Sequence, residues 1–327
     1  MALHGKTAMA VHTPVSADLL RPLARDLGLI LDGEPLPVAA GIENSTFFFT
    51  ATAGGAIRPY VLTLVEMADA GQARFAARLS SHLAERGLPV PAPLPDARGL
   101  RVHQLAGKPA LVFPRVPGHH PAPPTAGHCA TIGRFLGRAH RAAADLADPP
   151  ANRRGLAWLA ESARDLEPLL DGADRRLLAV QLSRYRQLAA READLPRGAI
   201  HGDLFQDNSL FEGDELRGVI DFYNACHDWL LLDLAIVAND WCAADGGGLD
   251  VSRLAALVNA YRAVRPLTAA EVAHWPGMLA IAATRFWVSR LLGRAGMFGG
   301  AGYGADKDPA EYRDKLLAIT ATPPSLP

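Results

Sequence analysis

The side chains with the clearest chemical potential lie in one short segment in the second half of the chain. The run HGDLFQDNSLF places Asp203 five positions before Asn208, and the run GVID places Asp221 at the end of a second apolar stretch. Residues 209–211 and 218–220 are short strand candidates joined by a tight polar turn, which predicts a hairpin. Such a hairpin returns Asp221 to the neighbourhood of Asn208, so that two carboxylates and an amide converge.

These three side chains suit phosphoryl transfer. Two carboxylates held together repel each other and raise their pKa values unless a cation lies between them. Oxygen ligands from Asn208 and Asp221 suit Mg²⁺, which keeps several waters and takes its remaining ligands from substrate phosphates. Asp203 is then available to accept the proton of an attacking hydroxyl. The alternative interpretation is two surface acids on a hairpin with a capping asparagine.

The same spacing occurs in a known catalytic loop. Kinases carry the loop H-R-D-L-x-x-x-N, followed by an aspartate at a strand end. With Gly202 in place of the arginine, the segment resembles the aminoglycoside phosphotransferase and choline kinase group of small-molecule kinases. The resemblance implies ATP and Mg²⁺ as cofactors, Asp203 as the catalytic residue and Asn208 and Asp221 as metal ligands. It also implies structural residues that brace the loop, namely His140, His201, Asp228 and Asp233.

The order of the predicted elements fits an α+β protein with a two-lobed, protein-kinase-like fold. Patterning predicts a helix over 17–27, strands over 47–50, 60–65, 101–105 and 110–113, and a helix over 70–86. Further helices are predicted over 125–146, 156–170, 174–193, 229–242, 251–264 and 268–292. We therefore divide the chain into an extension over 1–16, an N-terminal sheet lobe over 17–113, a connector over 114–124, a helical lobe over 125–317 and a tail over 318–327.

If the helical lobe is kinase-like, the sheet lobe should cover ATP. The run GIENST over 41–46 occupies the place of a phosphate-covering loop, whose backbone N–H groups contact phosphate oxygens. The usual strand lysine is missing, because Thr63 stands at its position, and we expect a substituted arrangement with Arg78 as a source of positive charge. The expected nucleotide-binding residues are Glu43, Asn44, Ser45, Thr46, Val61, Thr63, Arg78, Phe113, Arg115 and Val116. The glycine-rich run over 300–305 is interpreted as a flexible loop or lid.

Longer segments of the sequence resemble one branch of this kinase group in particular. The runs GIENST, YVLTL, GVIDFY, DLAI, NDWC and RFWVSR are similar to bacterial homoserine kinases of the phosphotransferase-like type, over about residues 9–317. This implies ATP-dependent phosphorylation of the side-chain hydroxyl of L-homoserine to O-phospho-L-homoserine, in threonine biosynthesis. A zwitterionic acceptor needs a cationic partner for its carboxylate and an acidic or aromatic partner for its ammonium. The candidates are Arg285 and Arg290 for the first, and Tyr223, Asn224, Asp240 and Trp241 for the second.

Composition excludes several other classes. The 327 residues include 33 basic and 34 acidic side chains, so the formal charge of −1 argues against binding to nucleic acid or to a membrane surface. With 49% apolar and 20% charged residues, the chain is not disordered. The three cysteines fit neither a disulfide framework nor a zinc site, and no signal or membrane segment stands out. We expect a cytoplasmic enzyme, while the sequence leaves its oligomeric state open.

Two alternatives stay open. One is a kinase of another small alcohol, such as choline, ethanolamine, methylthioribose or hydroxylysine. The other is a nucleotide-binding pseudokinase that regulates a partner, which the missing strand lysine favours and the retained Asp203, Asn208 and Asp221 oppose. A protein kinase is the least favoured interpretation, because no activation segment fits between Asp221 and Asp228.

Overall fold

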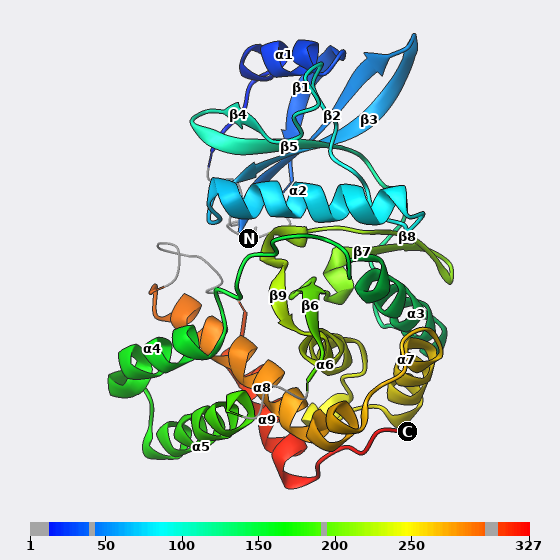
Figure 1. Cartoon of the computed structure of the whole chain (residues 1–327). Coiled ribbons are helices and arrows are strands. Elements are labelled where there is room, and N and C mark those ends of the chain that lie inside the picture. The colour runs from blue at the N-terminus through cyan, green and yellow to red at the C-terminus, as the bar shows by residue number, and fades with distance from the viewer. Residues whose placement is uncertain (1–12, 39–42, 191–194, 298–306) are drawn as a thin grey trace, which may run out of the picture. The chain divides into compact units, whose positions relative to one another are not determined.

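The structure, a computed structural model, describes residues 13–38, 43–190, 195–297 and 307–327. The run over 300–305, the first two residues of the run over 41–46 and most of the expected extension lie outside these ranges. The chain divides into two compact units, Met1–Ala84 with Val90–Val116, and Glu85–Pro89 with Pro117–Pro327. An antiparallel sheet in the first unit and a mainly helical second unit confirm the α+β class (Figure 1).

Among the described residues of the first unit, five strands form one antiparallel sheet in the order β1-β2-β3-β5-β4. The strands are β1 (Ile30–Pro37), β2 (Asn44–Ala53), β3 (Ala56–Val65), β4 (His103–Leu105) and β5 (Lys108–Pro114). The sequence did not predict β1, because Gly33 and two prolines interrupt it; it is an edge strand with an irregular register between Asp32 and Leu36. Strand β2 begins at Asn44, earlier than expected, so the second half of the run over 41–46 is strand and not loop.

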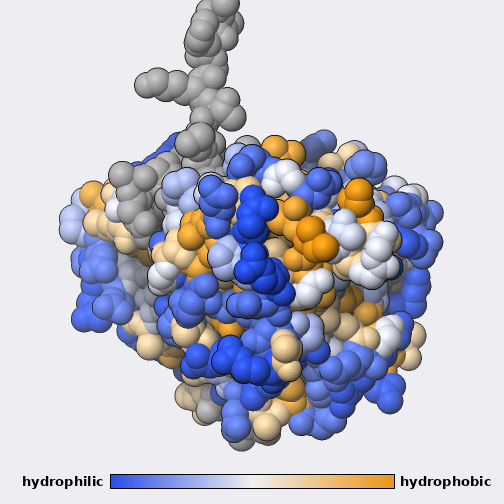
Figure 2. All heavy atoms as spheres, turned by 90° about the horizontal axis from the view of Figure 1, so that it is seen from above, coloured by the Kyte–Doolittle hydropathy of each residue, from blue (hydrophilic) through white to orange (hydrophobic). Residues whose placement is uncertain are grey.

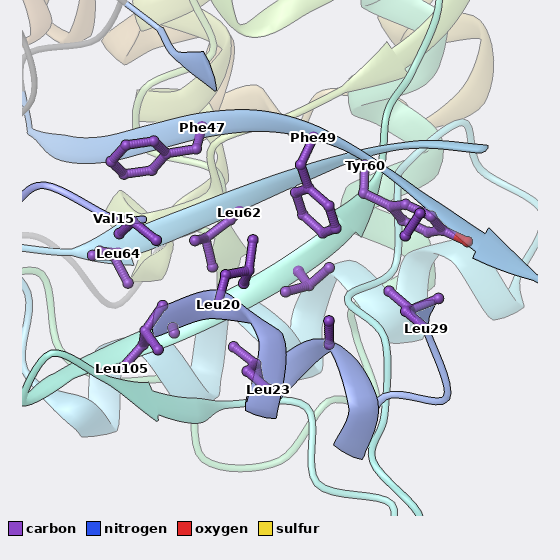
Figure 3. Packing of buried hydrophobic residues seen from close by; sticks show 14 residues of the cluster. Val15, Leu20, Leu23, Leu29, Phe47, Phe49, Tyr60, Leu62, Leu64 and Leu105 are labelled. Carbon is purple, nitrogen blue, oxygen red and sulfur yellow. The ribbon is translucent and has the colours of Figure 1, made fainter. Parts of the chain in front are cut away.

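Helix α1 (Ala17–Asp26) covers one face of this sheet, and Figure 3 shows the side chains that fill the space between them. Phe47, Phe49, Leu62 and Leu64 alternate with less buried residues along β2 and β3 and point toward the helix, as the two-residue period of a strand requires. Leu20 and Leu23 supply the helix side of the core. Helix α2 (Ala70–Glu85) lies on the other side of the sheet (Figure 1).

The second unit combines helices with two short strand pairs. The helices are α3 (Ala126–Ala142), α4 (Leu156–Leu166), α5 (Gly172–Ala189), α6 (Leu230–Trp241), α7 (Val251–Val264), α8 (Ala269–Arg294) and α9 (Pro309–Ala321). Strands β7 (Ser209–Glu212) and β8 (Glu215–Val219) form the expected hairpin, whereas the pair of β6 (Arg197–Ile200) with β9 (Cys226–Trp229) was not predicted. Helix α9 was also missed, although Asp308 caps it and Pro309 occupies its first turn.

Figure 2 shows one face of the protein, which carries both hydrophilic and hydrophobic side chains. On the face shown in Figure 2, hydrophobic residues occupy several separate areas between hydrophilic ones. Within the described part of the chain, no helix is long and apolar enough to cross a membrane.

Helices α3 and α7 pack at unusually short range because two glycines of α3 face α7. A Cβ atom added at Gly133 would lie 2.3 Å from the carbonyl oxygen of Leu257, and one at Gly137 would lie 3.0 Å from the Cβ of Val264. The backbones therefore touch directly, and no side chain fits between them.

We expect Gly133→Ala to destabilise the protein by more than about 2 kcal/mol, because the methyl group must push two packed helices apart. Gly277→Ala is the matched control, since this exposed glycine lies within α8 and its added Cβ would meet nothing within 4 Å. The control should be neutral or stabilising by up to about 1 kcal/mol, as alanine favours helices over glycine. Denaturant unfolding measures both, and equal effects of the two substitutions would contradict the close-packing argument.

Candidate active site

The segment with the predicted catalytic motif is a loop between β6 and β7. At Gly202 the backbone adopts φ +76°, and a Cβ atom there would lie 2.8 Å from the carbonyl oxygen of Asn224. Both the positive φ and the close approach require glycine at this position. The absence of a side chain thus lets the loop lie directly against residue 224.

A buried carboxylate holds this loop in place. Asp233, at the start of α6 and without solvent exposure, accepts hydrogen bonds from the backbone N–H groups of His201 (2.8 Å) and Gly202 (2.9 Å). Its third partner is Nε2 of His140 at 3.1 Å, and Nδ1 of His140 lies 2.8 Å from the hydroxyl of Tyr261. Burial alone would raise the pKa of Asp233, but these hydrogen bonds and the neighbouring histidines lower it below its usual value.

Tyr261 was not among the predicted site residues. It lies on α7, and no local motif marks it, because its contact with His140 arises from the packing of α3 against α7. Asp228, the other predicted bracing acid, accepts from Nδ2 of Asn152 at 2.6 Å and from the backbone N–H of Trp229 at 2.7 Å. It therefore fixes β9 to the loop before α4.

The hairpin brings the two predicted metal ligands together. The backbone N–H of Ile220 donates to the carbonyl oxygen of Asn208 at 3.0 Å, which places Asn208 beside the residue that precedes Asp221. Nδ2 of Asn208 donates to the carbonyl oxygen of Asp203 at 2.8 Å, so the amide oxygen is the atom that it can offer to a metal. A carboxylate and an amide oxygen are ligands that suit Mg²⁺.

Asp221 has an unusual backbone conformation. Its φ of 64° and ψ of 61° lie in the left-handed region, which is costly for a residue other than glycine. Such outliers persist where the surrounding structure enforces them, and they cluster at functional sites. The conformation falls at the exit of β8, where the chain leaves the hairpin, so it sets the direction of the Asp221 side chain.

Asp203 is half-buried and held by its neighbours. Its Oδ2 accepts a hydrogen bond from Nδ2 of Asn224 at 3.3 Å, and its backbone N–H donates to Nδ1 of His201 at 3.3 Å. The His201 ring packs 4.6 Å from that of Phe222, and its Nε2 lies 3.0 Å from the carbonyl oxygen of Ile220. Asp203, the amide of Asn208 and the hairpin thus form one connected hydrogen-bonded group.

The predicted acceptor-binding residues separate into two groups. Asn224 contacts Asp203, and Asp240 accepts the backbone N–H of Gln206, in the same loop, at 2.8 Å. Burial raises the pKa of Asp240 to about 6. Arg285 lies beside Gly202, with Nη1 4.0 Å from the position of a Cβ at that glycine.

The remaining members, Trp241, Arg290 and Tyr223, lie in α6, in α8 and in the turn after Asp221. Trp241 is fully buried and donates from Nε1 to the carbonyl oxygen of Leu204 at 3.1 Å, so it supports the loop from the core. Arg290 pairs with Glu311 at 2.6 Å and donates to the carbonyl oxygen of Asp308, which joins α8 to α9. Tyr223 is buried at the turn after Asp221.

In the first unit, predicted nucleotide-binding residues share one face of the sheet. Residues directly opposite each other in an antiparallel pair lie on the same face. Thr46 pairs with Thr63, and Val61 pairs with Phe113, so all four lie on the face away from the α1 core. The guanidinium of Arg115 lies 4.0 Å from the ring centroid of Phe48 on that face.

Other predicted residues of the first unit are placed differently. Ser45 is fully buried, and its hydroxyl donates to Glu66 at 2.6 Å and accepts a hydrogen bond from the backbone N–H of Thr13. The hydroxyl therefore forms hydrogen bonds within the first unit. Asn44 accepts the backbone N–H of Glu66 through its Oδ1. Arg78 lies on the exposed side of α2, 5.5 Å from the ring of Phe75. Glu43 and Val116 are half-buried.

The fold and the predicted catalytic loop are those of kinase-like phosphotransferases that act on small molecules. Residues 34–267 match the Phosphotransferase enzyme family. A homoserine kinase of Pseudomonas aeruginosa (strain LESB58) is 43% identical over 310 residues, with 94% of this chain and 96% of that protein covered. The homoserine kinase of Methylobacillus flagellatus is 44% identical over 285 residues, with 86% and 87% covered. The chain belongs to the homoserine kinase branch of this phosphotransferase family.

Solved structures agree on the fold at low sequence identity. The amicoumacin kinase hAmiN, in complex with AMP-PNP, Ca²⁺ and Ami, has a TM-score of 0.65 at 18% identity, with 92% of this chain and 93% of that chain covered. A choline/ethanolamine kinase family protein from Mesorhizobium loti has a TM-score of 0.64 at 18% identity, with 93% and 92% covered. These likenesses confirm the expected kinase-like fold.

The buried His201 predicts a pH dependence of stability. Burial lowers the pKa of His201 below its usual value, so the unfolded chain takes up a proton at a higher pH than the folded one. The free energy of unfolding should therefore fall as the pH drops below about 6.5, by up to about 1.4 kcal/mol per pH unit for this one proton.

We expect His201→Gln to flatten this slope between pH 7 and pH 5, because glutamine can still donate and accept but does not titrate. His119→Gln, at an exposed histidine, is the control and should keep the slope. Denaturant unfolding at several pH values measures the effect. A slope that His201→Gln leaves intact would show that another group is responsible.

Proposed function

We propose that the protein transfers the terminal phosphoryl group of ATP to the side-chain hydroxyl of L-homoserine and forms O-phospho-L-homoserine, a step of threonine biosynthesis. The observation that carries this proposal is the hydrogen-bonded group of Asp203, Asn208 and the hairpin that ends at Asp221. It occurs in a chain that matches bacterial homoserine kinases over nearly its whole length. The protein thus acts on a small molecule, and we place it in the cytoplasm.

Asp203 is the residue that binds the hydroxyl of the acceptor and takes its proton. Its carboxylate accepts the hydroxyl proton as the new oxygen–phosphorus bond forms and the bond to the ADP oxygen breaks. The amide of Asn224, 3.3 Å away, orients that carboxylate, and Asp233 fixes the backbone that carries it. Because the transition state of phosphoryl transfer is loose, positioning of the hydroxyl is the main task of these residues.

Asn208 and Asp221 would hold Mg²⁺ through one amide oxygen and one carboxylate. When bound, the ion would neutralise charge on the phosphates of ATP. The left-handed backbone at Asp221 supports this role, because strained backbone conformations cluster at functional sites. The amide of Asn208 is oriented by its donation to the carbonyl oxygen of Asp203, which couples the metal ligand to the catalytic loop.

For the nucleotide, we assign the face of the first unit's sheet that bears Thr46, Val61, Thr63 and Phe113. The mixed polar and apolar character of this face suits a ligand with an aromatic base and a charged tail. The backbone at Arg115 and Val116 would contact the base, and the start of β2 with Glu43 would contact the phosphates. Arg78 is the candidate for additional positive charge.

Replacement of the proposed catalytic base, Asp203, tests this function. Asp203→Asn should reduce kcat by about 10²- to 10⁴-fold, the usual contribution of a general base, without unfolding the protein. Asp207→Asn is the matched control, because Asp207 lies in the same loop with an exposed carboxylate and should leave turnover within about twofold. A coupled assay of ADP release with ATP, Mg²⁺ and L-homoserine measures both variants.

Two results would contradict the proposal in different ways. Full activity in Asp203→Asn would remove Asp203 from the reaction. If the unaltered protein released no more ADP with homoserine than without it, the acceptor would be wrong. A panel of choline, ethanolamine, methylthioribose and hydroxylysine in the same assay would then identify another alcohol, or show that none is used.

A further inference from the structure

A buried arginine with two unsatisfied guanidinium nitrogens lies beside the predicted catalytic loop. Arg285, on α8, is 5% exposed, and among the described residues its Nε and Nη1 atoms have no hydrogen-bond partner. Burial of an ionised group is costly unless other groups satisfy it, and an arginine fork binds a carboxylate through two parallel hydrogen bonds. Two buried guanidinium nitrogens left unsatisfied in this way indicate that a ligand completes their hydrogen bonds.

The position of Arg285 fits the acceptor and not the metal. Its Nη1 lies 4.0 Å from the position of a Cβ at Gly202, the residue before Asp203, and its guanidinium carbon lies 4.8 Å from the ring centroid of Phe286. Gly202 in turn touches Asn224, which donates to Asp203. Arg285 therefore belongs to the Asn224 side of the loop, whereas the proposed metal ligands belong to the hairpin.

The electrostatic surroundings of Arg285 are those of an anion site. Burial and the positive charge of Arg154 both lower the pKa of Arg285, while the carboxylates of Asp203 and Asp228 act in the opposite sense. The loop that carries Arg154 is anchored, because Asn152 accepts the Arg154 backbone N–H at 2.8 Å and donates to Asp228 at 2.6 Å. Two arginines thus contribute positive potential on the acceptor side of Asp203.

We propose that Arg285 binds the carboxylate of the acceptor and thereby restricts the enzyme to alcohols that carry a carboxylate. This inference rests on the proposed function, since homoserine has three carbon atoms between its hydroxyl and its carboxylate. An acceptor held at Arg285 by its carboxylate presents its hydroxyl to Asp203. Amino alcohols without a carboxylate leave the guanidinium unsatisfied and bind poorly, because a site built to form hydrogen bonds rejects a ligand that lacks them.

The test compares L-homoserine with L-homoserinol, in which a hydroxymethyl group replaces the carboxylate. The unaltered protein should prefer homoserine in kcat/KM by at least about a hundredfold. In Arg285→Met this preference should fall to within a few-fold, through a raised KM for homoserine, while the KM for ATP stays unchanged. Arg285→Lys, which keeps the charge but not the fork, should lie between the two. Arg294→Met, at an exposed arginine of the same helix, is the control and should keep the preference.

Stability distinguishes ligand binding from a structural role. If Arg285 serves only the ligand, its removal relieves an unpaired buried charge, and Arg285→Met should raise the melting temperature of the ligand-free protein. A lowered melting temperature with an unchanged preference for homoserine would overturn the proposal. So would a raised KM for ATP with the preference intact, which would assign Arg285 to a phosphate.

Binding measured by calorimetry, in the presence of Mg²⁺ and ADP, separates this inference from the proposed function. Homoserine that binds to the unaltered protein and not to Arg285→Met supports the carboxylate contact even if no phosphoryl transfer is seen. Homoserine that is phosphorylated equally well by both proteins rejects the role of Arg285 and leaves the proposed function intact. A lack of homoserine binding to the unaltered protein rejects both.

Discussion

The active-site geometry of the second unit depends on one buried carboxylate. Asp233 has no contact with solvent, so its charge persists only because two backbone N–H groups and His140 satisfy it. The same hydrogen bonds fix the backbone at His201 and Gly202, directly before Asp203. Through His140 and Tyr261, the network extends to α7, and Arg265 continues it to the buried Glu271 of α8. The predicted catalytic loop is thus held by helices distant from it in sequence.

Some buried charges among the described residues have complete hydrogen bonds, and Arg285 does not. This difference distinguishes charges that stabilise the fold from one that binds a ligand. Asp233 and Glu271 are buried with their hydrogen bonds completed by the protein, which is the arrangement expected of structural ions. Arg285 is buried with two nitrogens unsatisfied by the described residues. The near-neutral composition agrees with this local use of charge, because a small zwitterion and a nucleotide need only a few well-placed groups.

The sequence predicted what depends on local spacing. The run from His201 to Phe211 and the polar turn after it were sufficient to predict the hairpin, since strand length and turn chemistry are local properties. Pairings between distant segments were not predictable in this way: the β6–β9 pair and the contact of Tyr261 with His140 join residues far apart in sequence. Helix α9 was different, because its Asp-Pro start and the helical spacing of Tyr312, Leu316 and Ile319 are local signals that predict a helix.

The missing strand lysine shows why residue identity alone was insufficient in the first unit. Lys108 is close to β3 and pairs with Glu66, so it is the obvious substitute. Side chains alternate between the faces of a strand, and Lys108 shares its face with Ala110 and Val112, which belong to the α1 core. Thr63 and its partner Leu111 point to the opposite face. Lys108 therefore neutralises Glu66. Burial alone would raise the pKa of the Glu66 carboxyl, but the hydrogen bond from Lys108 helps to lower it. Lys108 does not replace the lysine expected at position 63.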